Sequence, residues 1–171
     1  MDSKILTTLE YSKILYRLSQ HASTSLGKQA AEALGPSSDL EEVKRLLQAT
    51  DEAYAADRLK GGAPFGGIAD IRASLHRAKI GGTLNPQELL EIASTALGGR
   101  RVKKHVAAVH EQHPVPMLQE AAERISEHKP LEDAILSCID DNAEVMDNAS
   151  PELASIRREL RSGESRIRER L

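Results

Sequence analysis

Residues 150–171, SPELASIRRELRSGESRIRERL, read as the start of a long, exposed helix. Ser150 offers a side-chain oxygen for an N-cap, Pro151 fits the first helical position, and Glu152 places a negative charge in the first turn. The apolar residues that follow recur at spacings of three, four, seven and four, and they are Leu153, Ile156, Leu160, Ile167 and Leu171. They form a narrow seam along a rod that is about 30 Å long at a rise of about 1.5 Å per residue.

The remaining surface of this helix is charged. Residues 152–171 carry six Arg and four Glu, and Gly163 interrupts the seam where another large residue is expected. No C-cap residue, Gly or Pro marks a helix end at Leu171. We therefore expect the helix to continue past Leu171 in a larger protein. The domain boundary expected from the sequence separates a helical core over residues 1–149 from a long helix that begins at 150–171.

The composition favours helices over a sheet. The chain has 171 residues, of which 40% are hydrophobic, but only 2% are aromatic and none is Trp. The core must therefore be built from Leu, Ile, Val and many Ala residues. Ala favours closely packed helices, whereas strands prefer β-branched and aromatic residues. The sequence therefore predicts an all-α fold with a multi-helix core.

Charge and cysteine content exclude several classes of protein. The net charge is −3 while residues 152–171 contribute +2, so the chain is not strongly basic as a whole. Cys138 is the only cysteine, which rules out an internal disulfide and a cysteine-based zinc site. No apolar run is long enough for a membrane span and no signal peptide is evident. We expect a soluble cytoplasmic protein without a membrane partner.

Periodicity and capping signals predict seven further helices before Ser150. The surest start is Asn85-Pro86-Gln87-Glu88, which combines an N-cap, a proline at the first helical position and a glutamate that can complete a capping box. Ser38-Asp39-Leu40-Glu41 is a second capping box, and the helix behind it has a predicted buried stripe of Leu40, Val43, Leu47 and Tyr54. The predicted helices cover residues 3–22, 26–34, 39–60, 71–80, 86–111, 117–125 and 131–139.

Three stretches are predicted to interrupt the helices. Residues 61–67, with four Gly and one Pro, must form a loop. Gly98-Gly99 lies inside a predicted helix and should bend or break it, because each glycine costs about 1 kcal/mol relative to alanine. Turn-forming residues flank a short extended run over 140–149, so we expect at most one short β-turn or hairpin there.

Motifs for catalysis or cofactor binding are weak. Gly27-Lys28 resembles the end of a phosphate-binding loop, but Ala22 replaces the required glycine and Gln29 replaces the required Ser or Thr. The loop over 61–67 follows a helix and not a strand, so it lacks the context in which such loops bind phosphate. Metal sites are also disfavoured, because neither the spacing of the histidines at 105, 110 and 113 nor the acidic residues near 140–147 matches a known ligand pattern. We expect no catalytic, cofactor or metal site in this chain.

One concentrated basic patch stands out before Ser150. It consists of Arg100, Arg101, Lys103 and Lys104, followed by His105. Arg100, Lys103 and Lys104 share one helical face at spacings of three and four residues, and such a patch can contact nucleic-acid phosphates. Aromatic residues for base stacking are absent beside it in the sequence, so a solvated helix face is the competing interpretation.

Six stretches of the chain form a recognisable pattern, and they are Thr8-Leu9-Glu10-Tyr11 with Ile14, residues 21–28, 64–72 and 77–84, residues 139–147, and residues 149–158. Together they resemble the N-terminal region of the bacterial MutS type two family, whose members are mismatch-repair paralogues. The similarity extends in the same order over essentially the whole chain. Ala143 stands where a glycine is expected in a turn of that family, and Gly163 interrupts a helix that should be smooth.

The resemblance implies a function for the parent protein rather than for this segment. Family members of this type begin with a helical core, or lever, that carries a clamp and leads to a dimeric ATPase and usually to a nuclease domain. They are linked to suppression of recombination and to rescue of collided ribosomes. The chain is then expected to be a non-catalytic core and lever fragment that couples the ATPase to a clamp on DNA or ribosomes. ATP and Mg would belong to the parent's ATPase domain, and the parent would be a homodimer with endonuclease activity.

Two alternatives remain open at this stage. The chain could be a free-standing helical module that pairs with another helix through the seam over residues 153–171. It could also contact nucleic acid weakly through the basic patch at Arg100, Arg101, Lys103 and Lys104. The sequence does not decide between DNA and the ribosome as the main substrate of the parent.

Overall fold

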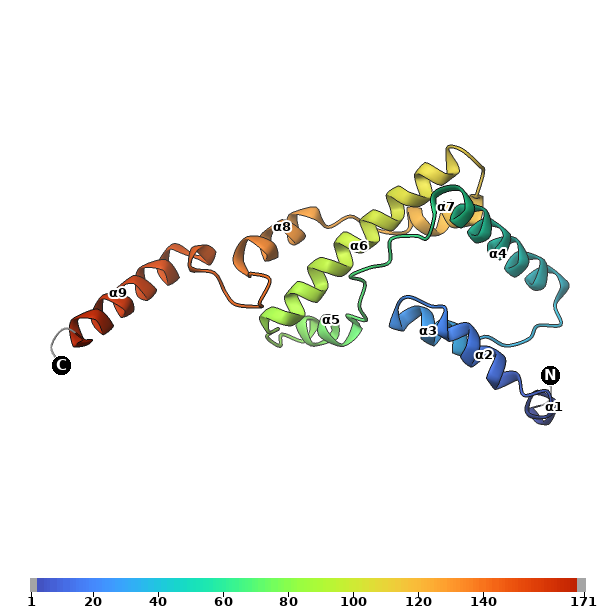
Figure 1. Cartoon of the computed structure of the whole chain (residues 1–171), viewed down its shortest axis with the longest axis horizontal. Coiled ribbons are helices and arrows are strands. Elements are labelled where there is room, and N and C mark those ends of the chain that lie inside the picture. The colour runs from blue at the N-terminus through green and yellow to red at the C-terminus, as the bar shows by residue number, and fades with distance from the viewer. Residues whose placement is uncertain (1–2, 169–171) are drawn as a thin grey trace. The chain divides into compact units, whose positions relative to one another are not determined.

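The computed structural model describes residues 3–168, and these residues form an all-α fold without a sheet. The only strand-like pairing in this range is an isolated antiparallel bridge between Ile139 and Val145. The elements in chain order (Figure 1) are α1 (Ser3–Thr8), α2 (Tyr11–Gln20), α3 (Ser25–Glu32), α4 (Leu40–Lys60), α5 (Arg72–Lys79), α6 (Pro86–His110), α7 (Pro116–Glu123), α8 (Lys129–Cys138), the 3-10 turn η1 (Asp147–Ala149) and α9 (Pro151–Arg168).

The chain divides into two compact units. Unit 1 contains residues 1–70 and 95–127, and unit 2 contains residues 71–94 and 128–171. Helix α6 therefore contributes its first part to unit 2 and the remainder to unit 1. The boundary expected from the sequence between residues 149 and 150 is not tested by this division and stays a prediction.

Unit 1 packs α2 against α3 and α4 against α7. Its buried core is small: Ala56 of α4, Val109 of α6 and Val115 before α7, with Leu118 packed against them. The carboxylate of Glu52 is also buried, and its Oε2 accepts hydrogen bonds from the backbone N–H groups of Met117 (2.8 Å) and Leu118 (3.0 Å). Glu52 thus caps the N-terminus of α7 from a neighbouring helix and joins the two elements.

Unit 2 is built around one cluster of buried aliphatic residues. Ile92 and Ala93 of α6 meet Ile135 and Ile139 at the end of α8. After Ile139 the chain reverses direction in a short hairpin, passes through η1 and enters α9. The predicted turn or hairpin over 140–149 is confirmed in this form.

The N-caps predicted from the sequence for α6 and α9 are confirmed. At α6, the Glu88 N–H donates to Asn85 Oδ1 and the Asn85 N–H donates to Glu88 Oε2, both at 2.9 Å, which is a reciprocal capping box. At α9, the Leu153 N–H donates to Ser150 Oγ at 3.1 Å. Helix α4 is capped one residue later than predicted, because Asp39 and not Ser38 accepts from the first free N–H groups.

The predicted single helix over 3–22 is wrong. Helix α1 ends at Thr8, and α2 begins at Tyr11 after Glu10 adopts a left-handed backbone conformation with φ of 50°. Glu10 is the N-cap residue of α2, and its carboxylate pairs with Lys13 in the first turn of that helix at 2.6 Å. An apolar pattern at helical spacing did not reveal this break, because both helices share the same period.

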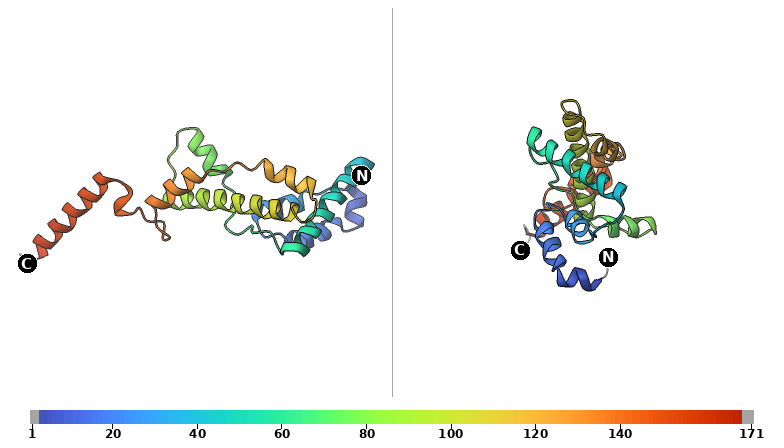
Figure 2. Two further views of the ribbon diagram at one scale, coloured as in Figure 1. Left: turned by 90° about the horizontal axis from the view of Figure 1, so that it is seen from above. Right: turned by 90° about the vertical axis from the view of Figure 1, so that its right-hand side faces the viewer.

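The expected break at Gly98-Gly99 is also wrong. Helix α6 runs without interruption from Pro86 to His110 (Figure 2). A Cβ on Gly98 would lie 2.6 Å from Ile68 Cγ1, and one on Gly99 would lie 3.3 Å from Ile125 Cγ2. The two glycines therefore let neighbouring segments of unit 1 approach the helix closely, and that packing offsets their low helix propensity.

The predicted buried stripe of α4 is wrong as well. Leu40, Leu47 and Tyr54 are 65%, 60% and 63% exposed, and Val43 is half-buried. The buried residues of α4 are instead Glu52 and Ala56, because α7 packs on the face that carries them. The apolar face of α4 is therefore left without cover within the described residues.

Candidate functional site

The basic patch on α6 is not gathered into one exposed surface. Arg101 and Lys104 are exposed, whereas Arg100 and Lys103 are half-buried. Lys103 Nζ donates to the Ile125 carbonyl oxygen at 3.0 Å and lies 3.9 Å from a carboxylate oxygen of Glu127. Lys103 thus ties α6 to the segment after α7, and Arg100 also has an interaction partner. Only Arg101 and Lys104 are left as solvent-facing cations of the four.

The most organised polar site surrounds the start of α9. Asp147, on η1, accepts hydrogen bonds from two arginines of α9: Arg157 Nη1 donates to its Oδ1 at 2.7 Å and Arg161 Nη2 donates to its Oδ2 at 2.8 Å. Arg157 Nη1 also donates to the Val145 carbonyl oxygen at 2.7 Å. The two arginines are one helical turn apart, so they meet both oxygens of one carboxylate. We call Asp147, Arg157 and Arg161 the anchor cluster.

The hairpin before η1 holds Asp147 in place. The Ala143 N–H donates to the Asp140 carbonyl oxygen at 3.0 Å, and the Asp140 N–H donates to the Glu144 carbonyl oxygen at 2.9 Å. Asp140 Oδ1 also accepts from the N–H groups of Asn142 and Glu144. This is a tight turn whose last residue, Ala143, has a left-handed backbone with φ of 61°. The turn fixes the direction of the chain that carries Asp147 toward α9.

Electrostatics of the anchor cluster favour the charged carboxylate. The hydrogen bond from Arg157, then that from Arg161, holds the pKa of Asp147 below its ordinary value of 3.8. Asp147 is therefore ionised at neutral pH and paired with two permanent cations. The sequence did not predict this cluster, because Asp147 lies in the stretch over 140–149 where only a turn or hairpin is expected. The usable signal was an acidic residue three positions before the N-cap followed by two Arg spaced four apart.

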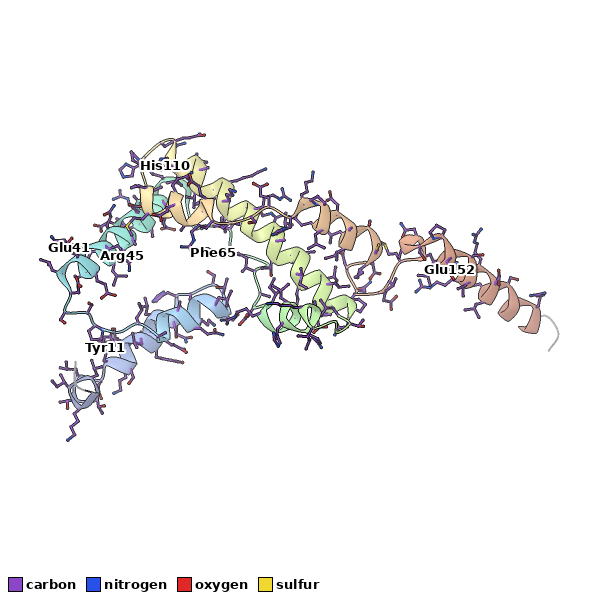
Figure 3. The ribbon with its side chains drawn as sticks, turned by 180° about the vertical axis from the view of Figure 1, so that it is seen from behind. Tyr11, Glu41, Arg45, Phe65, His110 and Glu152 are labelled. Carbon is purple, nitrogen blue, oxygen red and sulfur yellow. The ribbon has the colours of Figure 1, made fainter. Side chains whose placement is uncertain are left out.

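The seam of α9 is open along the part that the structure describes. Ile156 and Leu160 are exposed, and Leu153 is half-buried. The side chain of Ile167 and the whole of Leu171, which complete the predicted seam, lie outside the described residues. Glu152 stands on the first turn of α9, as expected for an acidic residue at a helix N-terminus (Figure 3).

Histidines and acidic residues do not converge on a metal site within residues 3–168. His110 has a structural contact, since its Nδ1 accepts from the Val115 N–H at 3.1 Å where the chain turns from α6 into α7. In the same range, no helix combines the length and the apolar character that crossing a membrane requires. The described residues therefore form an all-helical segment in which the anchor cluster holds the N-terminal part of the charged helix α9 against η1.

Comparison with known proteins assigns this segment to a family. No family model matches the chain. It is, however, 49% identical to the protein named endonuclease MutS2 of Geobacillus sp. (strain WCH70), 47% identical to that of Geobacillus kaustophilus and 45% identical to that of Brevibacillus brevis. Each match covers 100% of this chain and 22% of the relative. The chain belongs to the MutS2 family and matches the N-terminal part of its members.

Proposed function

We propose that this chain is the helical core and lever segment of a MutS2-type protein and performs no catalysis itself. Its task is to couple a dimeric ATPase further along the parent chain to a clamp that holds DNA or a collided ribosome. The relatives carry the name endonuclease, so we extend endonuclease activity to the parent and not to this segment. The ATPase activity of the parent is what the family resemblance implies. The single observation that carries the proposal is the anchor cluster at the root of α9.

A lever must be stiff and must be fixed at one end. Helix α9 runs from Pro151 to Arg168, and its charged surface suits a helix that projects into solvent. Arg157 and Arg161, on successive turns of α9, both donate hydrogen bonds to the Asp147 carboxylate of η1. Arg157 also donates a hydrogen bond to the Val145 carbonyl oxygen of the hairpin. A movement of the hairpin and η1 is then transmitted to α9, because the hydrogen bonds leave no flexible joint between them.

The parent supplies the remaining parts of this function. ATP and Mg would be bound by its ATPase domain, and its homodimer would form outside this segment. We place the parent in the cytoplasm, where its proposed substrates occur. Either DNA or the ribosome fits the proposal, because the clamp that would distinguish them is not in this chain.

The proposal is tested by weakening the anchor in the full-length parent protein. Asp147→Asn removes the charge that Arg157 and Arg161 share. Asp141→Asn, on the exposed tip of the same hairpin, is the matched control. We expect Asp147→Asn to keep basal ATP hydrolysis and to reduce its stimulation by branched DNA or by ribosomes. Equal stimulation in both variants and in the wild type contradicts the coupling role.

The isolated chain provides a second test of the same proposal. We expect it to hydrolyse no ATP and to cut no DNA in assays where the parent is active. Hydrolysis that copurifies with the chain and disappears in a point variant of it would assign catalysis to this segment.

A second candidate function is helix pairing through the seam of α9. The observation that favours it is the exposure of Ile156 (48%) and Leu160 (61%) on one side of the helix. It predicts a concentration-dependent dimer by light scattering that Leu160→Glu abolishes. A monomer at all concentrations, with no protein recovered by affinity capture, rejects it.

The nucleic-acid contact remains a third proposal, now centred on Arg101 and Lys104. It predicts weak binding that falls with salt and that Ala substitution of these two residues abolishes. Lys103→Ala is the informative comparison, since Lys103 is engaged with Ile125. Binding that survives the double substitution at Arg101 and Lys104 argues against the contact.

A further inference from the structure

Unit 1 contains a partly open cavity between α4, α6, α7 and the glycine-rich loop that follows α4. Its volume is about 450 Å³, which lies in the range of small-ligand sites. The walls are mostly apolar and come from small side chains, including Ala53, Ala56 and Ala122, together with Val102 and Val106. Small side chains on three helices leave space that larger residues would fill.

The loop over residues 61–67 contributes the rim of the cavity. Gly61 has φ of +76°, a conformation that glycine adopts without strain, and nothing lies within 4 Å of the position of a Cβ there. Phe65 is the only Phe of the chain. It lines the cavity and is 42% exposed, and Figure 3 labels its position. An aromatic ring at the rim of an apolar cavity offers a face for another ring to stack on.

Three polar side chains also line the cavity: Ser23, Asp57 and His105. In the described part of the chain, no side-chain hydrogen bond or ion pair engages Asp57 or His105. Asp57 Oδ1 lies 3.8 Å from where a Gly62 Cβ would stand, so the carboxylate faces the glycine rim. An ionised carboxylate only accepts hydrogen bonds, whereas the imidazole of His105 can donate or accept.

These groups restrict the chemistry of a ligand. A purely aliphatic occupant would cover Asp57 without giving it a hydrogen-bond donor, and that desolvation is costly. An anion would be repelled by the same carboxylate. A divalent metal ion would find one carboxylate and one imidazole, too few for a stable site.

From these observations we propose that the cavity is a binding site for a small heteroaromatic ring that carries an N–H donor. The ring would stack against Phe65 and fill the alanine-lined space, and its N–H would donate to Asp57. His105 would meet a second polar atom where the ligand has one. This site is independent of the anchor cluster and of the proposed coupling function.

Indole is a suitable probe because the chain contains no Trp. Its fluorescence is therefore read without tryptophan background, and emission shifts to the blue when the ring enters an apolar site. We expect a saturable blue shift when the 171-residue chain is titrated into indole. Indene, which has the same shape but no N–H, should compete less effectively.

Variants separate the cavity from non-specific adsorption. Ala53→Phe should fill the cavity and abolish the saturable shift, whereas Thr50→Phe, on the exposed surface of the same helix, should leave it unchanged. Asp57→Asn should weaken the binding of indole roughly fivefold and change the binding of indene by no more than about twofold, because only indole donates a hydrogen bond to the carboxylate. Circular dichroism checks that each variant is folded, and Ala121→Phe replaces Ala53→Phe if the latter is not.

Three results would overturn the proposal. One is the absence of a saturable shift with the wild-type chain. Another is a shift of equal size in a folded Ala53→Phe or Ala121→Phe variant. The third is an equal loss of affinity for indole and for indene in Asp57→Asn, which would show that the carboxylate does not recognise the N–H donor of indole.

Discussion

Ala143 has a backbone conformation that is unfavourable for a residue with a Cβ. It closes the hairpin after Asp140 with φ of 61°, a region that a side chain with a Cβ adopts only at a cost of about 1–2 kcal/mol. The turn persists because Asp140 accepts two backbone N–H groups and the Ile139–Val145 bridge holds its ends. Glycine is the residue that this position favours on physical grounds.

Replacing Ala143 by glycine should therefore stabilise the chain. We expect Ala143→Gly to raise the free energy of unfolding by about 1 kcal/mol, measured by urea denaturation. Ala134→Gly, at an exposed position inside α8, serves as the control and should lower it by about 1 kcal/mol. A loss of stability in Ala143→Gly would mean that the left-handed turn is not the native one.

Gly98 illustrates the opposite case, in which glycine is required by packing. The Cβ of an alanine would lie 2.6 Å from Ile68 Cγ1, which is too close for any real contact. We expect Gly98→Ala to destabilise the chain by about 1–3 kcal/mol despite the better helix propensity of alanine. Gly163→Ala, where nothing lies within 4 Å, should instead stabilise α9 by up to about 1 kcal/mol. Equal effects at both positions would contradict the packing argument.

Between elements, Glu52 is the clearest structural link. Its carboxylate is buried and accepts from two N–H groups at the start of α7, where the helix has no acceptor of its own. We expect Glu52→Ala to lower the free energy of unfolding by about 2 kcal/mol or more, because two buried donors lose a charged acceptor.

A matched control for Glu52 is available on the same helix. Asp51 is exposed, so Asp51→Ala should change the free energy of unfolding by no more than about 0.5 kcal/mol. Hydrogen exchange can localise the effect, since the amides of Met117 and Leu118 should lose protection in Glu52→Ala only. Unchanged protection of these amides would show that Glu52 does not cap α7.

Attachment of α9 should depend on pH through Asp147. Because the arginines hold the pKa of Asp147 below 3.8, the stabilisation is fully present above that value and is lost as the pH falls through the lower folded-state pKa. We expect the backbone amides in the N-terminal turns of α9 to lose protection from hydrogen exchange below about pH 4 and at high salt, since the anchor cluster is open to solvent. Asp147→Asn should show the weakened state at all pH values. A root that is equally protected at pH 7 and pH 3 would contradict this role.

Local signals were sufficient to predict part of the fold. The capping box of Asn85 and Glu88 and the cap at Ser150 depend on residues three apart, and the turn residues over 140–149 are contiguous. Links between distant residues could not be predicted in this way. Glu52 meets Met117 from 65 positions away, and Lys103 meets Ile125 from 22 positions away. The helical period is the same for a buried and an uncovered face, which is why the stripe of α4 was misassigned.

The candidate sites also combine features that local sequence reveals with contacts between distant residues that it does not. A run of basic residues is visible in the sequence, but only packing shows that Lys103 is occupied and that Arg101 and Lys104 remain exposed. The anchor cluster and the cavity in unit 1 could not be predicted, because none of their residues, taken singly, matches a sequence motif for a site. The family resemblance, in contrast, was carried by short runs in a fixed order, and it is confirmed by relatives at 45–49% identity.

At the scale of the whole molecule, the central claim is that α9 transmits movement as one stiff element. Gly163 offers a direct test because it lies within α9 with open space around it. Gly163→Pro breaks the helix at this point, and Gly163→Ala changes the same position while keeping it helical.

The decisive measurement is ATP hydrolysis by the full-length parent protein carrying each of these substitutions, with and without branched DNA or ribosomes. We predict that all three proteins have the same basal rate, that Gly163→Ala is stimulated like the wild type, and that Gly163→Pro is not stimulated. Normal stimulation of the Gly163→Pro protein would contradict the claim that α9 couples the ATPase to its substrate.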